Sequence, residues 1–538
     1  MSLAAVVMGT GVAAAAATPS PIAAPNLEYS QLAPMLVVFA AAVVGVLVEA
    51  FVPRELRRAV HLLVTFGALV AAFIWTCVIA ASSTIFAKGS PGHAAAMGAV
   101  AVDRPTLFIQ GTILVLAVVS VMLIADASHD VSSFAGQAAA VPGSTEERAG
   151  LVAGLVHTEI YPLTLFAVGG MLLFPASNDL LTMFVALETL SLPLYLLCGL
   201  ARRRRILSAE AAMKYFLLGA FSSAFFLFGI AMLYGYSGSV SLAKIAAAAS
   251  SGTGSDTLLF TGIALTGIGL LFKVGAVPFQ SWKPDVYQGA PTPITALMAS
   301  CTVVSAFGAL LRVFYVAFGT LTWDWRPALW VVAVLTMVVG AVIAITQTDV
   351  KRLLAYSSIA HAGFILTAVI SSSVQGLSSS LFYLATYGLS TVGAFAVITL
   401  VRDSGGEADH LSRWAGLGKR SPIVAGVFAL FLLTFAGIPL TSGFTGKFAV
   451  FQAAVAGGAT PLVIIGVVSS AIAAFFYVRV IVLMFFSDPV PDGPVVAVPS
   501  VFTGTAVAIG ALSAVVFGIV PGPVLDLANH AANQLFVR

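Results

Sequence analysis

Charged residues are scarce in this chain of 538 residues: Asp, Glu, Lys and Arg together make up 9% of it, while 59% of the residues are hydrophobic. Soluble globular proteins carry about 25% charged residues. This shortage of charge excludes an ordinary soluble fold and indicates a protein that crosses a membrane many times. The net charge of +3 is small, so no basic surface for nucleic acid is expected.

Cysteine is scarce as well. The three cysteines, Cys77, Cys198 and Cys301, stand in apolar stretches, and no CxxC pair occurs. This pattern disfavours a disulfide framework and a cysteine-based metal site. Phosphate-binding glycine loops and nucleophile elbows are also missing. Any redox cofactor or nucleotide that the function needs is therefore expected on another chain.

Apolar runs of about 20 residues, the length that spans a bilayer, follow one another along the chain. Fourteen of them predict an all-α polytopic membrane protein: 31–52, 59–81, 105–125, 158–175, 178–199, 209–236, 257–279, 292–319, 328–346, 352–371, 377–401, 421–456, 460–486 and 498–520. Residues 1–30 are interpreted as an irregular or short helical extension, because no Lys or Arg precedes their Ala-rich stretch as it would in a signal peptide.

Basic residues predict the orientation, since loops rich in Lys and Arg stay in the cytoplasm. Loops after odd-numbered runs are the richer set and contain Arg54, Arg57, Arg58, Arg148, Arg202, Arg203, Arg204, Arg205, Lys283, Lys351, Arg352, Arg402, Arg413, Lys419 and Arg420. Loops after even-numbered runs hold, with the C-terminus, Lys88, Arg104, Lys244, Arg326 and Arg538. Both termini are therefore expected outside the cytoplasm. The arginines at 202–205 are interpreted as a topology anchor, with a lipid headgroup site as the alternative.

Two of the runs contain helix breakers. Pro278 follows Lys273 by five residues, and Gly437 and Pro439 interrupt the run 421–456. A broken helix persists in a membrane only where protein or water satisfies the freed backbone groups. The breaks fall five runs apart, and a five-helix unit used twice must be inverted, as in many ion transporters. We expect an N-terminal extension with three helices at 1–157, repeats at 158–319 and 328–486, and a last helix with its tail at 487–538.

Five of the ionisable residues inside the apolar runs are the main functional candidates: Glu188, Lys214, Lys273, His361 and Lys447. A charge at bilayer depth costs about 2.5–3.5 kcal/mol on insertion scales, so such residues are functional candidates by default. If the two predicted halves pack side by side, these groups form a row along the bilayer midplane that could pass protons. That arrangement is a hypothesis about geometry.

A structural role stays open for most of the five. Glu188 could make a polar contact within the bundle, and His361 a hydrogen bond in helix packing. Lys273 could extend toward the headgroups near a kinked helix end. Lys214 follows Glu210 at i+4, so a local ion pair explains it as well as a reach to Glu188 would. Lys447 has no acidic neighbour in sequence, and a functional role is favoured there.

The stretch KVGAVPFQSWKPDVYQGAP at 273–291 resembles the signature of the antiporter-like, proton-pumping membrane subunits of respiratory complex I. Its second half is similar to subunit N, the bacterial counterpart of mitochondrial subunit 2. Further similar stretches are LETLSLP at 187–193, AAMKY at 211–215, QTDVKRLLAYSSIAH at 347–361 and AGIPLTSGFTGKF at 436–448. The resemblance covers about residues 30–520.

The resemblance implies fourteen helices, two inverted repeats and a plasma-membrane NADH–quinone oxidoreductase in which this chain moves protons. NADH, FMN, iron–sulfur clusters and quinone would be bound by other subunits. The partners would be other complex I membrane subunits, including antiporter-like neighbours, and lipids. Glu188 and Lys273 would be the central acid–lysine pair, Lys214 the lysine of the sixth helix, His361 the relay of the tenth, and Lys447 the lysine of the terminal half-channel.

Two positions depart from the family pattern. The family often has histidine where this chain has Gln280 and lysine where it has Val303, so the relay between Lys273 and His361 has a gap. Three alternatives stay open: a subunit of a multisubunit sodium/proton antiporter, a membrane-bound hydrogenase subunit, and a structural scaffold. Co-purifying NADH-oxidising, iron–sulfur chains would exclude the first, a nickel-containing partner would mark the second, and a scaffold would tolerate neutralised buried charges.

Overall fold

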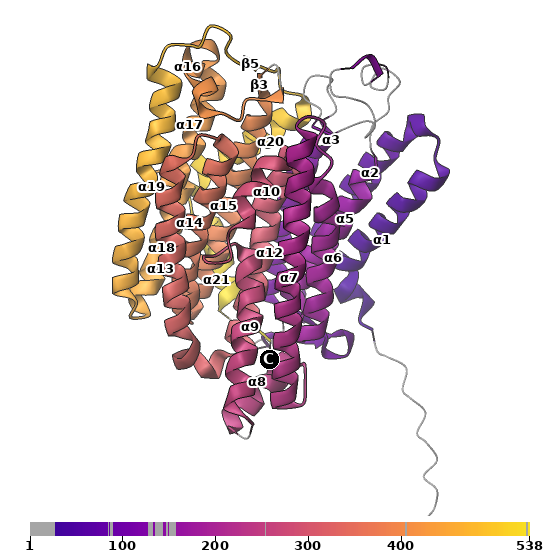
Figure 1. Cartoon of the computed structure of the whole chain (residues 1–538). Helices are drawn as coiled ribbons and strands as arrows, with labels where there is room; N and C mark the ends of the chain where they lie inside the picture. The colour runs from indigo at the N-terminus through magenta and orange to yellow at the C-terminus, as the bar shows by residue number, and fades with distance from the viewer. Residues whose placement is uncertain are drawn as a thin grey trace, which may run out of the picture.

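The computed structural model describes residues 27–83, 85–86, 90–126, 133–134, 144–146, 149, 158–252, 254–403, 406–533 and 536–537. In this part the chain is a bundle of mostly parallel and antiparallel helices with two small sheets (Figure 1). Most of the predicted N-terminal extension, residues 1–26, lies outside the described residues.

The longer helices are α1 (Tyr29–Phe51), α2 (Arg54–Ala80), α3 (Arg104–Ala125), α5 (Ile160–Ala176), α6 (Leu180–Cys198), α7 (Arg205–Ser237), α9 (Asp256–Val274), α13 (Thr322–Thr346), α14 (Val350–Ile370), α15 (Val374–Leu400), α17 (Pro422–Ala436), α18 (Ser442–Ala456), α19 (Thr460–Phe486) and α20 (Val501–Ile519). Helix α11 (Thr292–Leu297) continues through a π turn into α12 (Val303–Arg312) and a second π turn that ends at Ala317. The short helices are α8 (Leu242–Ser251), α10 (Trp282–Gly289), α16 (Leu417–Arg420) and α21 (Gly522–Ala532). Strand β1 (Gly92–Ala95) pairs with β2 (Val100–Asp103), and β3 (Val401–Asp403) lies between β4 (Gly406–Glu407) and β5 (Val495–Val496); both sheets are antiparallel.

The prediction of an all-α, multi-pass membrane protein is confirmed. Twelve helices of the described residues are long and apolar enough to cross a membrane. Helices α5 and α17 are apolar but shorter, with 17 and 15 residues. The count of fourteen spans stays a prediction, because it depends on whether α5 and the pair α17–α18 each cross the bilayer.

Three apolar segments form the interior of the bundle. In their most apolar windows, 100% of the residues from Thr292 to Ala317 are buried, 94% of those in α14 and 89% of those in α15. Outer helices such as α2 and α19 bury only 33% of the same kind of window. Polar groups on the interior helices therefore face protein, and their hydrogen bonds must be made inside the bundle.

The two ends of the described chain lie at the same end of the bundle. The Glu28 carboxylate accepts a hydrogen bond of 2.9 Å from the Ala96 N–H, and the Val537 N–H donates one of 3.0 Å to Asp103 at the start of α3. The sheet β3–β5 and helix α16 lie at the opposite end (Figure 1). This agrees with an even number of crossings, while the side on which the termini lie stays a prediction.

Two helices are broken, as predicted, at glycines in the left-handed region. Gly275 ends α9 with φ +80° and Gly437 ends α17 with φ +81°. At both breaks the glycine and the next residue donate backbone hydrogen bonds back to one carbonyl in the last turn, Leu271 in the first case and Leu433 in the second. Glycine is favoured there because a Cβ is strained at positive φ. The chain then resumes as α10 and α18.

The same pattern of helix neighbours occurs twice along the chain. Helix α6 packs on α7 as α14 packs on α15, α7 on α10 as α15 on α18, and α9 on α12 as α17 on α19. This recurrence supports the predicted repeats at 158–319 and 328–486. Those boundaries, and the outer segments 1–157 and 487–538, stay predictions.

Candidate functional site

Lys273 is buried in the bundle, with 3% of its surface exposed. It lies in the last turn of α9, and its ammonium donates hydrogen bonds to Ser191 Oγ on α6 at 2.6 Å and to the Tyr215 hydroxyl on α7 at 3.3 Å. The Tyr215 ring centre lies 5.2 Å from the same nitrogen. Burial, together with partners on two other helices, rules out an extension of this side chain to the headgroups.

Glu188 lies one turn before Ser191 on α6 and is half-buried. It is close enough to Lys273 for a Coulomb interaction, yet the described residues contain no direct ion pair between them. One carboxylate oxygen of Glu188 is buried without a protein hydrogen-bond partner among the described residues. The acid and the lysine are therefore neighbours across α6 and α9, with Ser191 as the group that contacts the ammonium.

Lys214 forms the local ion pair with Glu210 that its sequence spacing allows. Its ammonium contacts Glu210 at 2.6 Å, one turn earlier on α7, and Asp285 on α10 at 2.8 Å. Its side chain is 41% exposed. Asp285 also binds Arg352 at 2.6 Å, so this group links α7, α10 and α14. The alternative in which Lys214 reaches Glu188 is not what the structure has.

His361 is buried near the middle of α14 among tyrosines. Its Nδ1 shares a hydrogen bond of 2.6 Å with the Tyr383 hydroxyl, its Nε2 lies 3.4 Å from the Tyr477 hydroxyl, and its ring stacks on Tyr387 at 4.6 Å between centres. These three tyrosines come from α15 and α19 and not from α14 itself.

A small cavity lies against His361. Its interior of about 10 Å³ is near the space that one water molecule needs. The wall includes Ser390 and Thr434 and the first turn of α18, where the Ser442 hydroxyl is buried without a protein partner among the described residues. This cavity joins the histidine to the break between α17 and α18.

Lys447 closes that break. Its ammonium donates to the backbone carbonyls of Phe435 and Ala436 at 2.8 and 2.9 Å and to Ser470 Oγ at 2.9 Å. It therefore fills all three donor positions of an ammonium group while lying in the interior, 5% exposed. The side chain arises from α18 and binds the end of α17, where the helix dipole favours a positive charge.

Two of the lysines that the sequence analysis counted among the basic loop residues are buried. The number of basic residues in the loops after odd-numbered runs is therefore too high by two. Lys283 is 0% exposed on α10 and donates to the Val274 carbonyl at 3.2 Å. Lys351 is 4% exposed in the first turn of α14. The prediction took every residue between two apolar runs as a loop residue. Lys283 instead lies on α10, the second half of a broken helix, and Lys351 lies at the start of α14, where other parts of the chain cover it.

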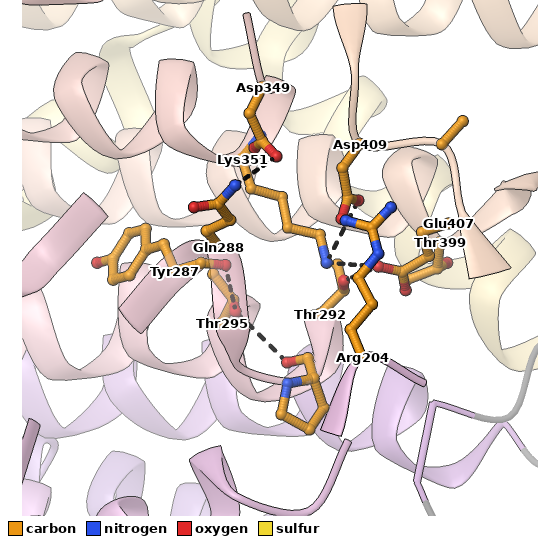
Figure 2. Close-up of polar contacts among 12 residues, drawn as sticks. Arg204, Tyr287, Gln288, Thr292, Thr295, Asp349, Lys351, Thr399, Glu407 and Asp409 are labelled. Carbon is orange, nitrogen blue, oxygen red and sulfur yellow. Dashed lines mark hydrogen bonds and ion pairs between the residues drawn. The ribbon is translucent and has the colours of Figure 1, made fainter. Parts of the chain in front are cut away.

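Lys351 is the centre of a charged cluster at the end of the bundle opposite the termini. It contacts Glu407 at 2.5 Å and Asp409 at 3.6 Å, and Figure 2 shows its ammonium between these two carboxylates. Arg204, from the predicted topology anchor, binds Asp409. Burial alone would raise the pKa of Glu407, but the charges of Lys351 and Arg402 lower it overall. Burial, with the nearby Glu407 charge, raises the pKa of Asp409 to about 6.

Val303 and Gln280, the two departures from the family pattern, both lie in the interior of the bundle or at its helix break. Val303 is buried on α12 and offers no polar atom. Gln280 lies between α9 and α10, and its amide oxygen is buried without a protein partner among the described residues. No group of three or more His, Cys, Asp and Glu residues that could hold a metal ion occurs in the described ranges.

Comparison with known proteins places this arrangement. Residues 177–473 match the family described as NADH:quinone oxidoreductase/Mrp antiporter, TM. A protein named NADH-quinone oxidoreductase subunit N from Rhodococcus opacus is 62% identical over 532 residues, which cover 95% of this chain and 97% of that protein. The chain belongs to the NADH-quinone oxidoreductase subunit N family.

Solved structures agree with this family. A chain of respiratory complex I from Thermus thermophilus superposes on this subunit N family member with a TM-score of 0.72 and 32% identity, covering 92% of this chain and 99% of that one. A chain of the Mrp complex from a Dietzia species has a TM-score of 0.78 at 21% identity over 95% and 97% of the two chains. The second likeness shows a shared fold alone, so the antiporter alternative gains no support from it.

Proposed function

We propose that this subunit N family member carries protons across the bacterial plasma membrane as a membrane-arm subunit of NADH-quinone oxidoreductase. The observation that carries the proposal is the set of buried cationic and imidazole groups in the interior of an apolar bundle: Lys273, His361 and Lys447. A charge at bilayer depth is costly, so buried ionisable residues of this kind are functional candidates by default. NADH, FMN, iron–sulfur clusters and quinone are assigned to other subunits, and antiporter-like subunits and lipids are its neighbours.

The proposed step is electrostatic. Glu188 stabilises the ammonium form of Lys273 through its charge, and Ser191 and Tyr215 hold that ammonium in place. When a signal from the redox subunits moves or neutralises Glu188, Lys273 holds its proton less tightly. The proton then passes by way of His361 to Lys447 and leaves on the side where the termini lie. Lys214, in its contacts with Glu210 and Asp285, is the proposed group that hands protons to or from a neighbouring subunit.

The proposed orientation puts the arginine-rich end of the bundle, with Arg204 and the β3–β5 sheet, in the cytoplasm and both termini outside. Attachment of a membrane-impermeant label to a single cysteine at either end tests it. A cysteine at exposed Asn533, near the C-terminus, should react from outside intact cells, and one at exposed Lys419 only after permeabilisation. The reverse pattern would contradict the orientation but not the relay.

The relay is tested in inverted membrane vesicles that contain the assembled complex. Lys273→Met and Lys447→Met each remove one ammonium and retain a long apolar side chain. NADH-driven proton translocation per electron should fall by about tenfold or more, since positioned proton-transfer groups contribute factors of this size and larger. Lys244→Met, at an exposed site on α8, is the control. Normal proton-to-electron ratios in the first two variants would refute the proposal.

The antiporter alternative is separated in the same preparation. A purified complex that contains FMN and iron–sulfur clusters and pumps equally well in sodium-free buffer excludes a secondary sodium/proton exchanger. Loss of pumping without sodium, in a complex that has no NADH-oxidising chains, would favour it.

A further inference from the structure

At each of the two helix breaks, a lysine from the following half-helix binds the end of the preceding one. An ideal Cβ on Gly275 would lie 2.8 Å from Lys283 Cδ and 3.2 Å from its Nζ. An ideal Cβ on Gly437 would lie 2.9 Å from Lys447 Cδ and 3.3 Å from its Nζ. The agreement within 0.1 Å means that the two lysine side chains lie over their glycines in the same way.

The two lysines also donate to equivalent backbone carbonyls. Lys283 donates to the carbonyl of Val274, the residue before Gly275, and Lys447 donates to the carbonyl of Ala436, the residue before Gly437. The counterpart of Lys447 in the first half of the protein is therefore Lys283. Lys273, in contrast, lies before its break and binds α6 and α7.

Lys283 differs from Lys447 in how its ammonium is satisfied. Lys447 has three oxygen acceptors, whereas Lys283 has one within the described residues, the Val274 carbonyl. Two N–H donors of Lys283 are thus left for water in a fully buried position, because an unpaired ammonium donor in a protein interior is costly. An ammonium that is bonded to water is in a position to exchange a proton.

The position of Lys283 bridges the gap left by Val303. Helix α10, which carries Lys283, packs on α14, which carries His361. His361 lies within Coulomb range of both Lys283 and Lys447. On the other side, Lys283 binds the backbone directly after Lys273. The order Lys273, Lys283, His361, Lys447 thus has a titratable group at each step, although Val303 supplies none.

Buried hydroxyl groups lie between Lys283 and His361. The Tyr287 ring centre is 5.8 Å from Lys283 Nζ, one turn along α10. The hydroxyls of Tyr287 and of Ser358, one turn before His361 on α14, are both buried without a hydrogen-bond partner by geometry among the described residues. Buried polar atoms of this kind are normally satisfied by bridging water, and such a bridge is the path that we infer from Lys283 to the histidine.

We propose that Lys283 carries the proton between Lys273 and His361 and takes the place of the lysine that the family often has at the position of Val303. In the step, one N–H bond breaks at Lys283 and one forms at His361, while each bridging hydroxyl or water accepts one proton and gives up another. One positive charge moves from α10 to α14. The inference rests on the proposed function.

Three variants of the assembled complex test it. Lys283→Arg keeps the positive charge and the donor to the Val274 carbonyl, but a guanidinium cannot release its proton. We expect normal assembly, with proton translocation per electron lowered by about tenfold or more. Lys283→Met should lose pumping in the same way. Lys283→Met combined with Val303→Lys should recover most of it, because the second change restores a lysine on α12. Lys244→Arg is the matched control.

The outcomes separate the two proposals. If Lys283→Arg pumps normally, Lys283 only caps α9 and the inference is wrong, even when Lys283→Met fails to assemble. Failure of Val303→Lys to restore any pumping in assembled Lys283→Met would also overturn it. If Lys273→Met and Lys447→Met abolish pumping while every Lys283 variant is normal, the inference alone fails. If none of these lysines matters, the proposed function fails first.

Discussion

Lys351 and Glu407 form an ion pair of 2.5 Å between the first turn of α14 and strand β4, with side chains 5% and 11% exposed. A buried pair of this kind is weak evidence for stability, but removing one partner leaves a buried charge, which typically costs about 3–5 kcal/mol. Glu407→Gln should therefore lower the thermal midpoint of the purified complex, with a loss near the low end because Asp409 remains 3.6 Å away.

The double variant Lys351→Met with Glu407→Gln separates the cost of an unpaired charge from a general loss of packing. Because no buried ammonium is left unpaired, the double variant should be more stable than Glu407→Gln alone. A double variant less stable than both single variants would show that the pair contributes mainly through its contacts and would contradict this explanation.

Asp409 should titrate close to neutral pH. Burial raises its pKa to about 6, well above the usual value of about 3.9 for aspartate. The folded state therefore holds this proton more tightly than the unfolded state, so the group contributes stability below about pH 4 that is lost as the pH rises to about 6. Infrared spectra should show a protonated carboxyl band that disappears near pH 6.

That band should be missing in Asp409→Asn and unchanged in Asp488→Asn. Asp488 is the matched control because it is exposed, and its hydrogen bond with Lys419 lowers its pKa. A band near pH 6 that survives in Asp409→Asn would assign the titration to another group.

The Asp103–Arg312 pair should be important for stability. Both side chains are 0% exposed, and one Arg312 nitrogen contacts the two Asp103 oxygens at 2.9 and 2.7 Å. Asp103 also accepts the N–H of Val537, so it holds the C-terminal residues against α3. Asp103→Asn should destabilise the subunit by about 3–5 kcal/mol, seen as a lower melting temperature and less assembled complex. Asp256→Asn, at the exposed start of α9, should change neither.

The sequence predicts the helices and both breaks well, because these depend on local chemistry. An apolar run of membrane length must be helical in a bilayer, and Gly275 and Gly437 stand where the chain needs a positive φ. The burial of Lys273 and Lys447 followed from the cost of a charge in an apolar segment. These predictions required no knowledge of which helices are neighbours.

The partners of those charges could not be predicted, because they depend on packing between distant segments. Lys351 meets Glu407 across the interval from α14 to β4, and His361 meets Tyr383 and Tyr477 from two other helices. Lys283 was assigned to a loop because hydropathy alone cannot distinguish a polar half-helix inside the bundle from a polar loop outside it. One local signal could have revealed the burial of Lys283. At each break a lysine follows the glycine by eight to ten residues.

Gly437→Ala tests whether the position of the Lys447 ammonium matters for pumping. An added methyl group at φ +81° is strained and would meet Lys447 Cδ at 2.9 Å, so the lysine side chain must move from the end of α17. We expect proton translocation per electron to fall severalfold while NADH-driven quinone reduction is less affected, since the proposed function assigns the redox groups to other subunits.

Gly458→Ala is the matched control for that change. Gly458 has a similar φ of +77°, but an added Cβ would meet nothing within 4 Å. Both alanine variants therefore bear the same kind of backbone strain, about 1–2 kcal/mol, and only one of them displaces a lysine. Reduced pumping in Gly437→Ala with normal pumping in Gly458→Ala ties the loss to the Lys447 ammonium. Equal losses in the two variants would instead attribute the effect to backbone strain and would remove this support for Lys447 as a proton carrier.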